Sequence, residues 1–586
     1  MQKGYSITDS KIIIDFSSLY CKDAQALLRS VVFSEILNRY LKRLSERKSP
    51  IYRELQRRLD DKELLPPMHT LLRLLHTHRA DEVIRINRRF ESLLTDPEIV
   101  YDFVEGLYNY WRSFERYIIL TAPKTRLRTR ESIHHAQFIH ANETLRQLVL
   151  QTYRVVCENL IDTPFRIYRQ LPAGAHVGYM VQNMKLILPD EFQPLRRIPV
   201  IRLALLEPPV IFYPQMNVRS GLFEEIWQNP LPHLDLKEDQ WFCYPAKIGR
   251  LLALAYFHQS YMSQGAGLVN LFEIAAPDDL SRRKPDIVLF FGANPLPGIE
   301  DQTVFYHDRA NEMMVGVNVH SQRIDYFGYM KKMLLTLHNI LMIERDLLPV
   351  HGAMVSIRLK SGAAANVVIV GDSGAGKSET LEAFRQLAED HISEMEIIFD
   401  DMGSIELTDE GDFLAYGTEI GAFLRLDDLQ PGYAFEQMDR SIFMNPNLTN
   451  ARVIVPVTTF KTVVRGTSID YFLYANNYEA VDAGHPAIDF HDNSAQALSV
   501  FNRGLRMAKG TTSEKGLVES YFANPFGPPQ RREMHETLAE RILAGMFARK
   551  VAVGQLRTQL GIAGMEQEGP RIAARALFSA MSEQAV

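Results

Sequence analysis

A glycine-rich stretch that carries one lysine and one serine has the residue types and the spacing to bind phosphate. An apolar, β-branched run, Val367-Val-Ile-Val370, leads into Gly371-x4-Gly376-Lys377-Ser378, and a helix-forming segment follows. Glycines suit such a turn because successive backbone N–H groups can face phosphate oxygens there, where a Cβ would block the approach. A helix that begins at Ser378 would add its own unpaired N–H groups. The spacing therefore predicts a P-loop.

The residue types within this loop predict their roles. Lys377 would bridge the β- and γ-phosphates of a nucleotide, and the hydroxyl of Ser378 would bind the metal ion that neutralises them. The predicted nucleotide-binding residues are Gly371, Asp372, Ser373, Gly374, Ala375, Gly376, Lys377, Ser378 and Glu379.

A pair of carboxylates follows the P-loop at the end of an apolar run, Glu396-Ile-Ile-Phe-Asp400-Asp401. A carboxylate at the end of a strand beside a P-loop can hold the divalent cation, while its neighbour orients that carboxylate or accepts a proton. Upstream lie Lys331, Lys332 and His351, residue types that by themselves are typical of a solvated helix face and a turn.

The order of these groups resembles that of the ATP-dependent phosphoenolpyruvate carboxykinases. Tyr326-Phe-Gly-Tyr-Met-Lys-Lys332, then His351, then the P-loop, then Asp400-Asp401 follow one another like that family's Tyr-x-Gly-x-Met-Lys-Lys, His and Gly-x-Ser-Gly-x-Gly-Lys elements. Three later segments are also similar to elements of that family: 448–456, 509–516 and 524–527. The resemblance covers residues 320–530.

The resemblance implies two metal ions. Lys332, His351 and Asp401 match positions that bind a transition metal, normally Mn²⁺, while Ser378 matches the position that binds Mg²⁺ with ATP. A lysine that binds a metal must be neutral, so its pKa would have to be lowered by the ion and by its neighbours. The implied cofactors are ATP, Mg²⁺ and Mn²⁺.

The resemblance also implies contacts with the substrate. Tyr326 and Lys331 match substrate-side positions, and Arg452 matches an arginine that contacts the transferring phosphoryl group, a role suited to its fork of donors. The implied catalytic residues are Lys331, Lys377, Asp400 and Arg452.

The sequence departs from the carboxykinase pattern in three places. The family's Gly-Arg-Ser-Pro-Lys-Asp segment, whose arginine holds the substrate carboxylate and carbon dioxide, is matched only faintly, by residues 282–286. Lys515 stands where the family has an arginine near the nucleotide, which removes a bidentate or stacking contact. His351-Gly352 and the P-loop itself are more similar to the HPr kinase/phosphorylase branch of the same superfamily.

These observations predict ATP- and metal-dependent phosphoryl transfer and leave three interpretations of the acceptor. A carboxykinase would convert oxaloacetate and ATP to phosphoenolpyruvate, ADP and carbon dioxide, and it needs no general base because decarboxylation generates the enolate oxygen. A kinase for a protein or small-molecule hydroxyl would need Asp400 to take a proton. The third interpretation is a nucleotide-binding regulator without turnover.

The spacing of apolar residues predicts helices and strands that together form a mixed α/β fold. With the resemblance, it predicts a carboxykinase-like P-loop domain that follows a helical N-terminal domain. Apolar residues recur at helical spacing from about 20 to 165, including 97–121. Beyond this region we expect strands at 198–206, 209–213 and 285–291 and helices at 246–262 and 327–345. The expected domains are 1–165 (helical), 166–320 (mixed α/β), 321–530 (P-loop) and 531–586 (helical tail).

Composition limits the partners and the compartment. The chain of 586 residues has a formal net charge of −6 and a pI of about 6.3, which argues against nucleic acids and anionic membranes as partners. Three widely spaced cysteines predict neither a disulfide framework nor a cysteine-rich metal site, which suits a reducing cytoplasm. The N-terminus shows no apolar signal segment, and no apolar run reaches membrane-spanning length. The oligomeric state stays open.

Overall fold

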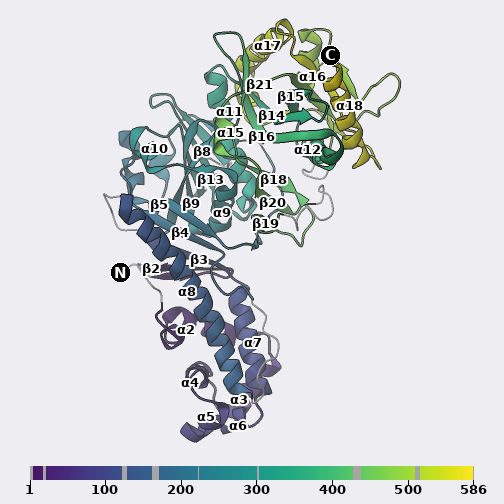
Figure 1. Cartoon of the computed structure of the whole chain (residues 1–586). Coiled ribbons are helices and arrows are strands. Elements are labelled where there is room, and N and C mark those ends of the chain that lie inside the picture. Colours follow the sequence, from purple (N-terminus) through teal and green to yellow (C-terminus); the bar gives the residue numbers. More distant parts are fainter. Residues whose placement is uncertain are drawn as a thin grey trace. The chain divides into compact units, whose positions relative to one another are not determined.

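The chain clusters into two compact units in a computed structural model (Figure 1). The structure describes residues 4–16, 21–121, 128–161, 171–221, 223–299, 303–426, 437–508 and 515–584. Unit 1 comprises residues 1–182 and 201–207, and unit 2 comprises 183–200 and 208–586. These units replace the four consecutive segments expected from the sequence, because strands formed by residues beyond 165 and beyond 530 complete the sheets of their neighbours.

Unit 1 is mainly helical but also contains strands. Its helices are α1 (Ala24–Leu28), α2 (Val31–Glu46), α3 (Pro50–Leu59), α4 (Leu65–Leu75), α5 (Ala80–Ile86), α6 (Glu91–Leu94), α7 (Glu98–Arg112) and α8 (Arg128–Leu160). Its strands follow the order β1 (Tyr5–Ile7), β2 (Lys11–Phe16), β3 (Glu115–Thr121), β4 (Val177–Gln182) and β5 (Val200–Leu206). The predicted helix over 97–121 is wrong in its last part, because the β-branched run of β3 pairs with β2 in parallel.

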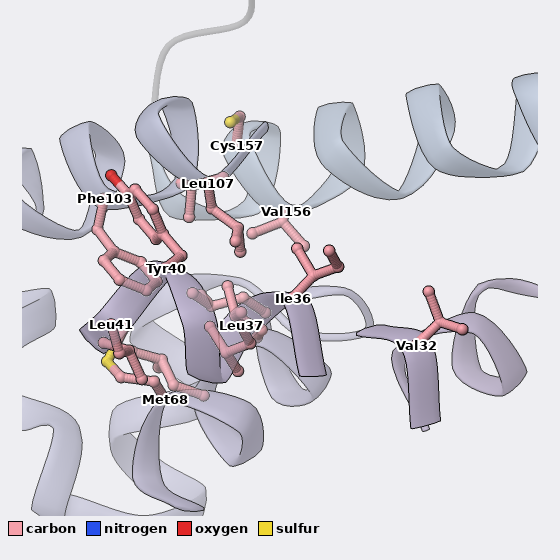
Figure 2. Close-up of a cluster of buried hydrophobic side chains, with 14 of the residues drawn as sticks. Val32, Ile36, Leu37, Tyr40, Leu41, Met68, Phe103, Leu107, Val156 and Cys157 are labelled. Atoms are coloured by element: carbon pink, nitrogen blue, oxygen red, sulfur yellow. The ribbon is translucent and has the colours of Figure 1, made fainter. Parts of the chain in front are cut away.

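The core of unit 1 lies between the apolar faces of its helices. Helix α2 begins where the Ser30 hydroxyl accepts a hydrogen bond from Phe33 N at 3.2 Å, a side-chain N-cap. Its buried residues recur at three- and four-residue spacing, so one stripe of the helix faces inward. Figure 2 shows Ile36 and Leu37 of α2 packed with Met68 of α4, Leu107 of α7 and Val156 of α8.

The first sheet of unit 2 runs in the order β8 (Trp241–Ile248), β9 (Leu251–His258), β11 (Ile287–Ala293), β13 (Met313–Val319), β12 (Thr303–Asp308) and β7 (Glu224–Ile226), with β10 (Glu273–Ile274) beside β8. The predicted helix over 246–262 is wrong. Residues 241–258 form a buried hairpin that turns at Gly249, whose φ is +52°, and helix α9 (Met262–Leu271) follows. Helix α10 (Pro277–Arg282) comes next, and the predicted helix at 327–345 is confirmed as α11 (Phe327–Glu344).

The second sheet of unit 2 carries the P-loop. Its order is β21 (Thr467–Ser468), β17 (Phe413–Gly417), β16 (Ile392–Leu407), β14 (Leu348–Leu359), β15 (Ala364–Val370), β22 (Tyr471–Asn476), β26 (Ala552–Arg557) and β23 (Ile488–Phe490). Parallel and antiparallel pairs both occur, so the predicted mixed α/β class is confirmed. Two smaller sheets join β18 (Gly421–Arg425), β20 (Arg452–Pro456), β19 (Ile442–Met444) and β6 (Val210–Phe212), and β24 (Arg506–Met507) with β25 (Leu517–Val518).

The C-terminal residues belong to the core of unit 2 and are not the helical tail expected from the sequence. Strand β26 lies between β22 and β23, and helix α18 packs against α12, the helix that follows the P-loop (Figure 1). The remaining helices are α12 (Lys377–Gln386), α13 (Ala388–His391), α15 (Phe460–Val464), α16 (Ser494–Arg503), α17 (Arg532–Ala548) and α18 (Glu568–Gln584).

Two further observations concern the chain as described. Cys21, Cys157 and Cys243 are buried and free. No helix in the described ranges combines the length and the apolar character that crossing a membrane requires.

Candidate functional site

The P-loop connects the end of β15 to the start of α12, as the sequence predicts, and α12 begins at Lys377, one residue earlier than expected. Gly374 and Gly376 have φ values of +78° and +97°, a region that favours glycine. A Cβ at Gly376 would lie 2.5 Å from the hydroxyl oxygen of Thr558. Glycine is therefore required at this position for both its backbone conformation and its lack of a side chain.

Residues distant in the sequence hold the loop in shape. Thr558 donates a hydrogen bond to the carbonyl oxygen of Ala375 at 2.7 Å, and the amide of Asn477 donates to that of Gly374 at 2.8 Å. The guanidinium of Arg506 donates to the carboxylate of Asp372 at 3.0 Å. No local motif marks these three supports, so sequence reasoning missed them.

Asp372 is an ionised group inside the loop. Burial acts to raise the pKa of Asp372, but His351, at 3.4 Å, and Arg506 outweigh it and hold that pKa well below its ordinary value. The ammonium of Lys377 donates to the backbone carbonyl of Asp372 at 3.1 Å. Asp372 thus contacts Arg506, His351 and, through its backbone, Lys377 at the base of the loop.

Asp400 faces the P-loop from strand β16, as the carboxylate pair predicts. The hydroxyl of Ser378 donates to Asp400 Oδ1 at 3.2 Å. Burial and then the neighbouring charge of Asp401 raise the pKa of Asp400, and Lys377 offsets only part of this effect. Ser378 and Asp400 are therefore close enough to share one cation, and Asp400 accepts a proton more readily than an ordinary aspartate.

Asp401 is the centre of the second cluster. Its Oδ2 accepts a hydrogen bond from Lys332 Nζ at 2.8 Å and forms an ion pair with Lys331, while its Oδ1 lies 2.8 Å from His351 Nε2. The backbone of Asp401 has a φ of +126°, an outlier for a residue with a side chain. Such strain recurs where a structure over-determines the position of a functional group.

Burial and charge make the two lysines different. Burial lowers the pKa of Lys332 to about 8, an effect that Asp401 only partly offsets. Burial also acts to lower the pKa of Lys331, but Asp401 and Glu419 outweigh it and raise that pKa above its ordinary value. Lys332 is therefore the lysine that loses its proton more easily, whereas Lys331 stays a cation.

The donor set fits the Mn²⁺ site that the resemblance implies. His351 places Nδ1 3.1 Å from the carbonyl oxygen of Ala523, so an Nδ1–H donor leaves the Nε2 lone pair facing Asp401. Metal-binding histidines usually donate their second ring N–H in this way. Among the described residues no three His, Cys, Asp or Glu side chains gather as a metal site, so Lys332 has to complete the set with its amine.

A buried glutamate that sequence reasoning missed lies beside Lys331. Glu419 lies between β17 and β18, is 1% exposed, and has its Oε1 3.3 Å from Lys331 Nζ. Burial raises the pKa of Glu419 to about 8, and Lys331 offsets only part of the effect. Apolar and small residues surround it in the sequence, and no local pattern links it to Lys331.

Between the P-loop and the strands β18 and β20 lies a pocket of about 90 Å³. The predicted residues that line it are Ser373, Gly374, Lys377, Ser378, Glu379, Asp400, Asp401 and Arg452. Arg452 stacks on Phe423 with 5.2 Å from its guanidinium carbon to the ring centre, and Arg425 also lines the pocket. The pocket thus combines anions that can hold cations with an arginine on the opposite wall.

The other predicted residues lie around this pocket without lining it. Gly371, Asp372, Ala375 and Gly376 form the body of the loop, and Lys331, Lys332 and His351 meet the pocket through Asp401. Tyr326 is buried, with its ring centre 5.9 Å from that of Phe423, and is the predicted residue least directly connected to the cluster.

Arg219, which the sequence analysis did not single out, lies beside Lys332 of the Asp401 cluster. The guanidinium carbon of Arg219 is 4.9 Å from the centre of the Phe526 ring, and Lys332 Nζ is 4.5 Å from the same centre. Ser220 N donates to the Tyr329 hydroxyl at 3.2 Å, which ties the segment to α11. Arg283, in the segment compared with the missing carboxykinase element, donates instead to the carbonyl oxygen of Arg250.

Comparison with models of protein families gives no match for this chain, and comparison with curated proteins gives none. In the late segment 509–516, residues 509–514 lie outside the described residues, and Lys515 is exposed.

Proposed function

We propose that unit 2 catalyses ATP- and divalent-metal-dependent phosphoryl transfer, and that the reaction is of the phosphoenolpyruvate carboxykinase type. The observation that carries the proposal is the position of the Lys332–His351–Asp401 cluster directly next to Asp400, which contacts the P-loop serine. A P-loop alone supports nucleotide binding only. The second cluster supplies nitrogen donors, which favour Mn²⁺ over Mg²⁺.

Each group has a role that follows from its position. The loop amides and Lys377 would hold the phosphates of ATP, Ser378 and Asp400 would hold Mg²⁺, and Lys332, His351 and Asp401 would hold Mn²⁺. Bound in this way, the two cations would neutralise charge on the transferring group. Arg452, on the opposite wall of the pocket, would contact that group with its fork of donors. Little covalent work remains for the protein in such a transfer.

Two features favour oxaloacetate as the acceptor. Arg219 lies against Phe526, beside the proposed metal ligand Lys332, so one cationic group stands close to the proposed metal site. Lys331, kept charged mainly by Asp401, adds a second. The enolate that decarboxylation releases attacks without a base, so Asp400 can remain on the metal.

The second candidate is a kinase that phosphorylates a hydroxyl of a protein or small molecule. The raised pKa of Asp400, which burial and Asp401 cause, favours it because a base must accept the hydroxyl proton. A nucleotide-binding regulator without turnover is the third candidate, and it would tolerate loss of Lys332 or His351. For all three we propose a cytoplasmic location, which suits three unpaired buried cysteines, and no nucleic-acid partner.

The deciding experiment incubates the purified full-length protein with ATP and Mn²⁺, with and without oxaloacetate, and measures phosphoenolpyruvate and ADP. A carboxykinase forms both products only when oxaloacetate is present. ADP formation that ignores oxaloacetate but requires a hydroxyl acceptor supports the kinase, and the absence of ADP under every condition supports the regulator.

Two variants with matched controls test the assignment of the site. His351→Ala should weaken activation by Mn²⁺ at least about tenfold and change ATP affinity little, because even the loss of a residue that only supports a metal ligand costs about tenfold or more in metal affinity. The exposed His485→Ala is the control. Arg219→Ala should raise the KM for oxaloacetate and leave the KM for ATP unchanged, with the exposed Arg282→Ala as its control. Equal effects of a variant and its control would contradict the assignment.

A further inference from the structure

His351 and the P-loop lie side by side on two paired strands. Strands β14 and β15 are antiparallel neighbours, and the backbone N–H of Gly371, the first residue of the loop, donates to the carbonyl oxygen of His351 at 2.8 Å. The strands approach closely at Gly352, where an added Cβ would lie 2.7 Å from the carbonyl oxygen of Ile369. This pairing brings Asp372, the second residue of the loop, beside the imidazole of His351.

The ring nitrogen Nδ1 of His351 faces two oxygen atoms. The carbonyl oxygen of Ala523 lies 3.1 Å from Nδ1, and the carboxylate oxygen Oδ1 of Asp372 lies 3.4 Å from it. Both oxygens are acceptors, so Nδ1 carries the hydrogen and Nε2, which faces Asp401, is the nitrogen that can bind a metal ion. Because His351 is fully buried, protein groups and not bulk solvent set this tautomer.

The carboxylate of Asp372 is itself held in place. Its Oδ1 also accepts a hydrogen bond from the backbone N–H of Ser373 at 2.7 Å, and its Oδ2 accepts one from Arg506 Nε at 3.0 Å. Asp372 is 6% exposed. Donors therefore face both oxygens of this side chain, an arrangement that suits a carboxylate, whereas an amide offers an acceptor on one side only.

We propose that Asp372 is a positioning residue of the transition-metal site, which holds His351 with its Nδ1–H toward the P-loop and its Nε2 lone pair toward the metal ion. Carboxylates commonly hold metal-binding histidines in this way, and they increase the basicity of the nitrogen that binds the metal. The P-loop thus serves the metal site as well as the phosphates, since Lys377 contacts the backbone of the same Asp372. This inference rests on the metal site of the proposed function.

The test titrates the purified full-length protein with Mn²⁺, without nucleotide or oxaloacetate, and measures free Mn²⁺ by electron paramagnetic resonance. Excess Mg²⁺ occupies the site at Ser378, and the loss of binding in His351→Ala identifies the second site. Asp372→Asn, which keeps the shape of the side chain, should weaken Mn²⁺ binding about tenfold, as expected for loss of a carboxylate that supports a metal ligand. Thr558→Val, which instead removes the hydrogen bond to Ala375, should leave Mn²⁺ affinity unchanged.

A double variant separates positioning from a merely structural role. In Asp372→Asn the charge of Arg506 attracts the amide oxygen, which turns the amide nitrogen toward the Nδ1–H of His351. Arg506→Met removes that attraction, so the double variant should recover Mn²⁺ affinity, and Arg506→Met alone should change it little. Two losses that add in the double variant would indicate a structural role and overturn the proposal.

A measurement on the parent protein decides the matter if Asp372→Asn does not fold. With ¹⁵N-labelled histidine and Zn²⁺ as a diamagnetic probe, long-range ¹H–¹⁵N NMR should show the hydrogen of His351 on Nδ1, and a hydrogen on Nε2 overturns the positioning role. Unchanged Mn²⁺ affinity in a folded Asp372→Asn overturns the positioning role alone. A parent protein that binds no Mn²⁺ overturns it together with the proposed metal site.

Discussion

Asp401 and His351 face each other from the paired strands β16 and β14, with 2.8 Å between the carboxylate oxygen Oδ1 and the ring nitrogen Nε2. The second oxygen of the same carboxylate contacts both Lys331 and Lys332. One carboxylate therefore contacts two buried lysine side chains as well as orienting an imidazole. This arrangement makes Asp401 a structural requirement whichever ion the site binds.

We expect Asp401→Asn to lower the free energy of unfolding by about 3–5 kcal/mol at pH 7, because it leaves buried ammonium groups without a counter-charge. Urea unfolding of the full-length protein measures the loss. Asp400→Asn is the matched control and should cost much less, since burial already opposes the charge of Asp400. Equal losses for the two variants would refute this account of the cluster.

Lys377→Ala should abolish nucleotide turnover and leave the fold intact. The side chain contributes a charge that faces phosphate and one hydrogen bond to a loop carbonyl, so its loss removes little packing. Because Lys377 is buried and its charge acts on Asp400, its loss should lower the free energy of unfolding by about 0.5–3 kcal/mol, the range of most single substitutions, without unfolding the protein. The exposed Lys461→Ala should affect neither property. Unchanged turnover in Lys377→Ala would remove the P-loop from the mechanism.

Gly376→Ala should eliminate ATP binding through two separable effects. The added Cβ meets the Thr558 hydroxyl at 2.5 Å, and the residue must also keep a φ of +97°. Combining it with Thr558→Ala removes the clash but not the backbone cost of about 1 kcal/mol or more. Calorimetric titration with ATP should therefore show partial recovery in the double variant. Full recovery would mean that the backbone conformation imposes no cost.

The stability of unit 1 should depend on His176 below pH 6.5. Burial and then the charge of Arg116 lower the pKa of His176 to about 3, and its Nδ1 accepts a hydrogen bond from Arg116 N at 3.1 Å. The neutral ring is thus the folded form, so the stabilisation is complete above the unfolded-state value of about 6.5 and is lost as pH falls toward 3.

The loss should reach up to about 1.4 kcal/mol for each pH unit below 6.5. Thermal unfolding from pH 7 to pH 4 measures it, and His176→Gln should flatten this dependence. The exposed His485→Gln serves as the control and should keep the parent profile. A His176→Gln profile as steep as that of the parent would assign the acid sensitivity to other groups.

Local spacing in the sequence was sufficient to predict the glycine-rich turn between a strand and a helix, and the strand that carries Asp400 and Asp401, because each lies within a few residues of its signal. It could not predict Glu419, Arg219 or Thr558, because their partners, Lys331, Phe526 and Ala375, lie on elements distant in the sequence. The errors at 115–121 and 246–262 share one cause. Both segments are buried on every face, so neither shows a period that separates a strand from a helix.

The position of β26 has a consequence for how the protein is made. This strand pairs with β22 in parallel, and the residue that follows it, Thr558, holds the P-loop through the carbonyl oxygen of Ala375. The ribosome adds Thr558 some 180 positions after the loop itself. Synthesis proceeds at about 5–20 residues per second, and domains fold during it with the N-terminal domain first. The nascent P-loop therefore lacks its support for about 10–35 seconds, an interval in which unit 1 can already fold and a chaperone has access to the open edge of β22.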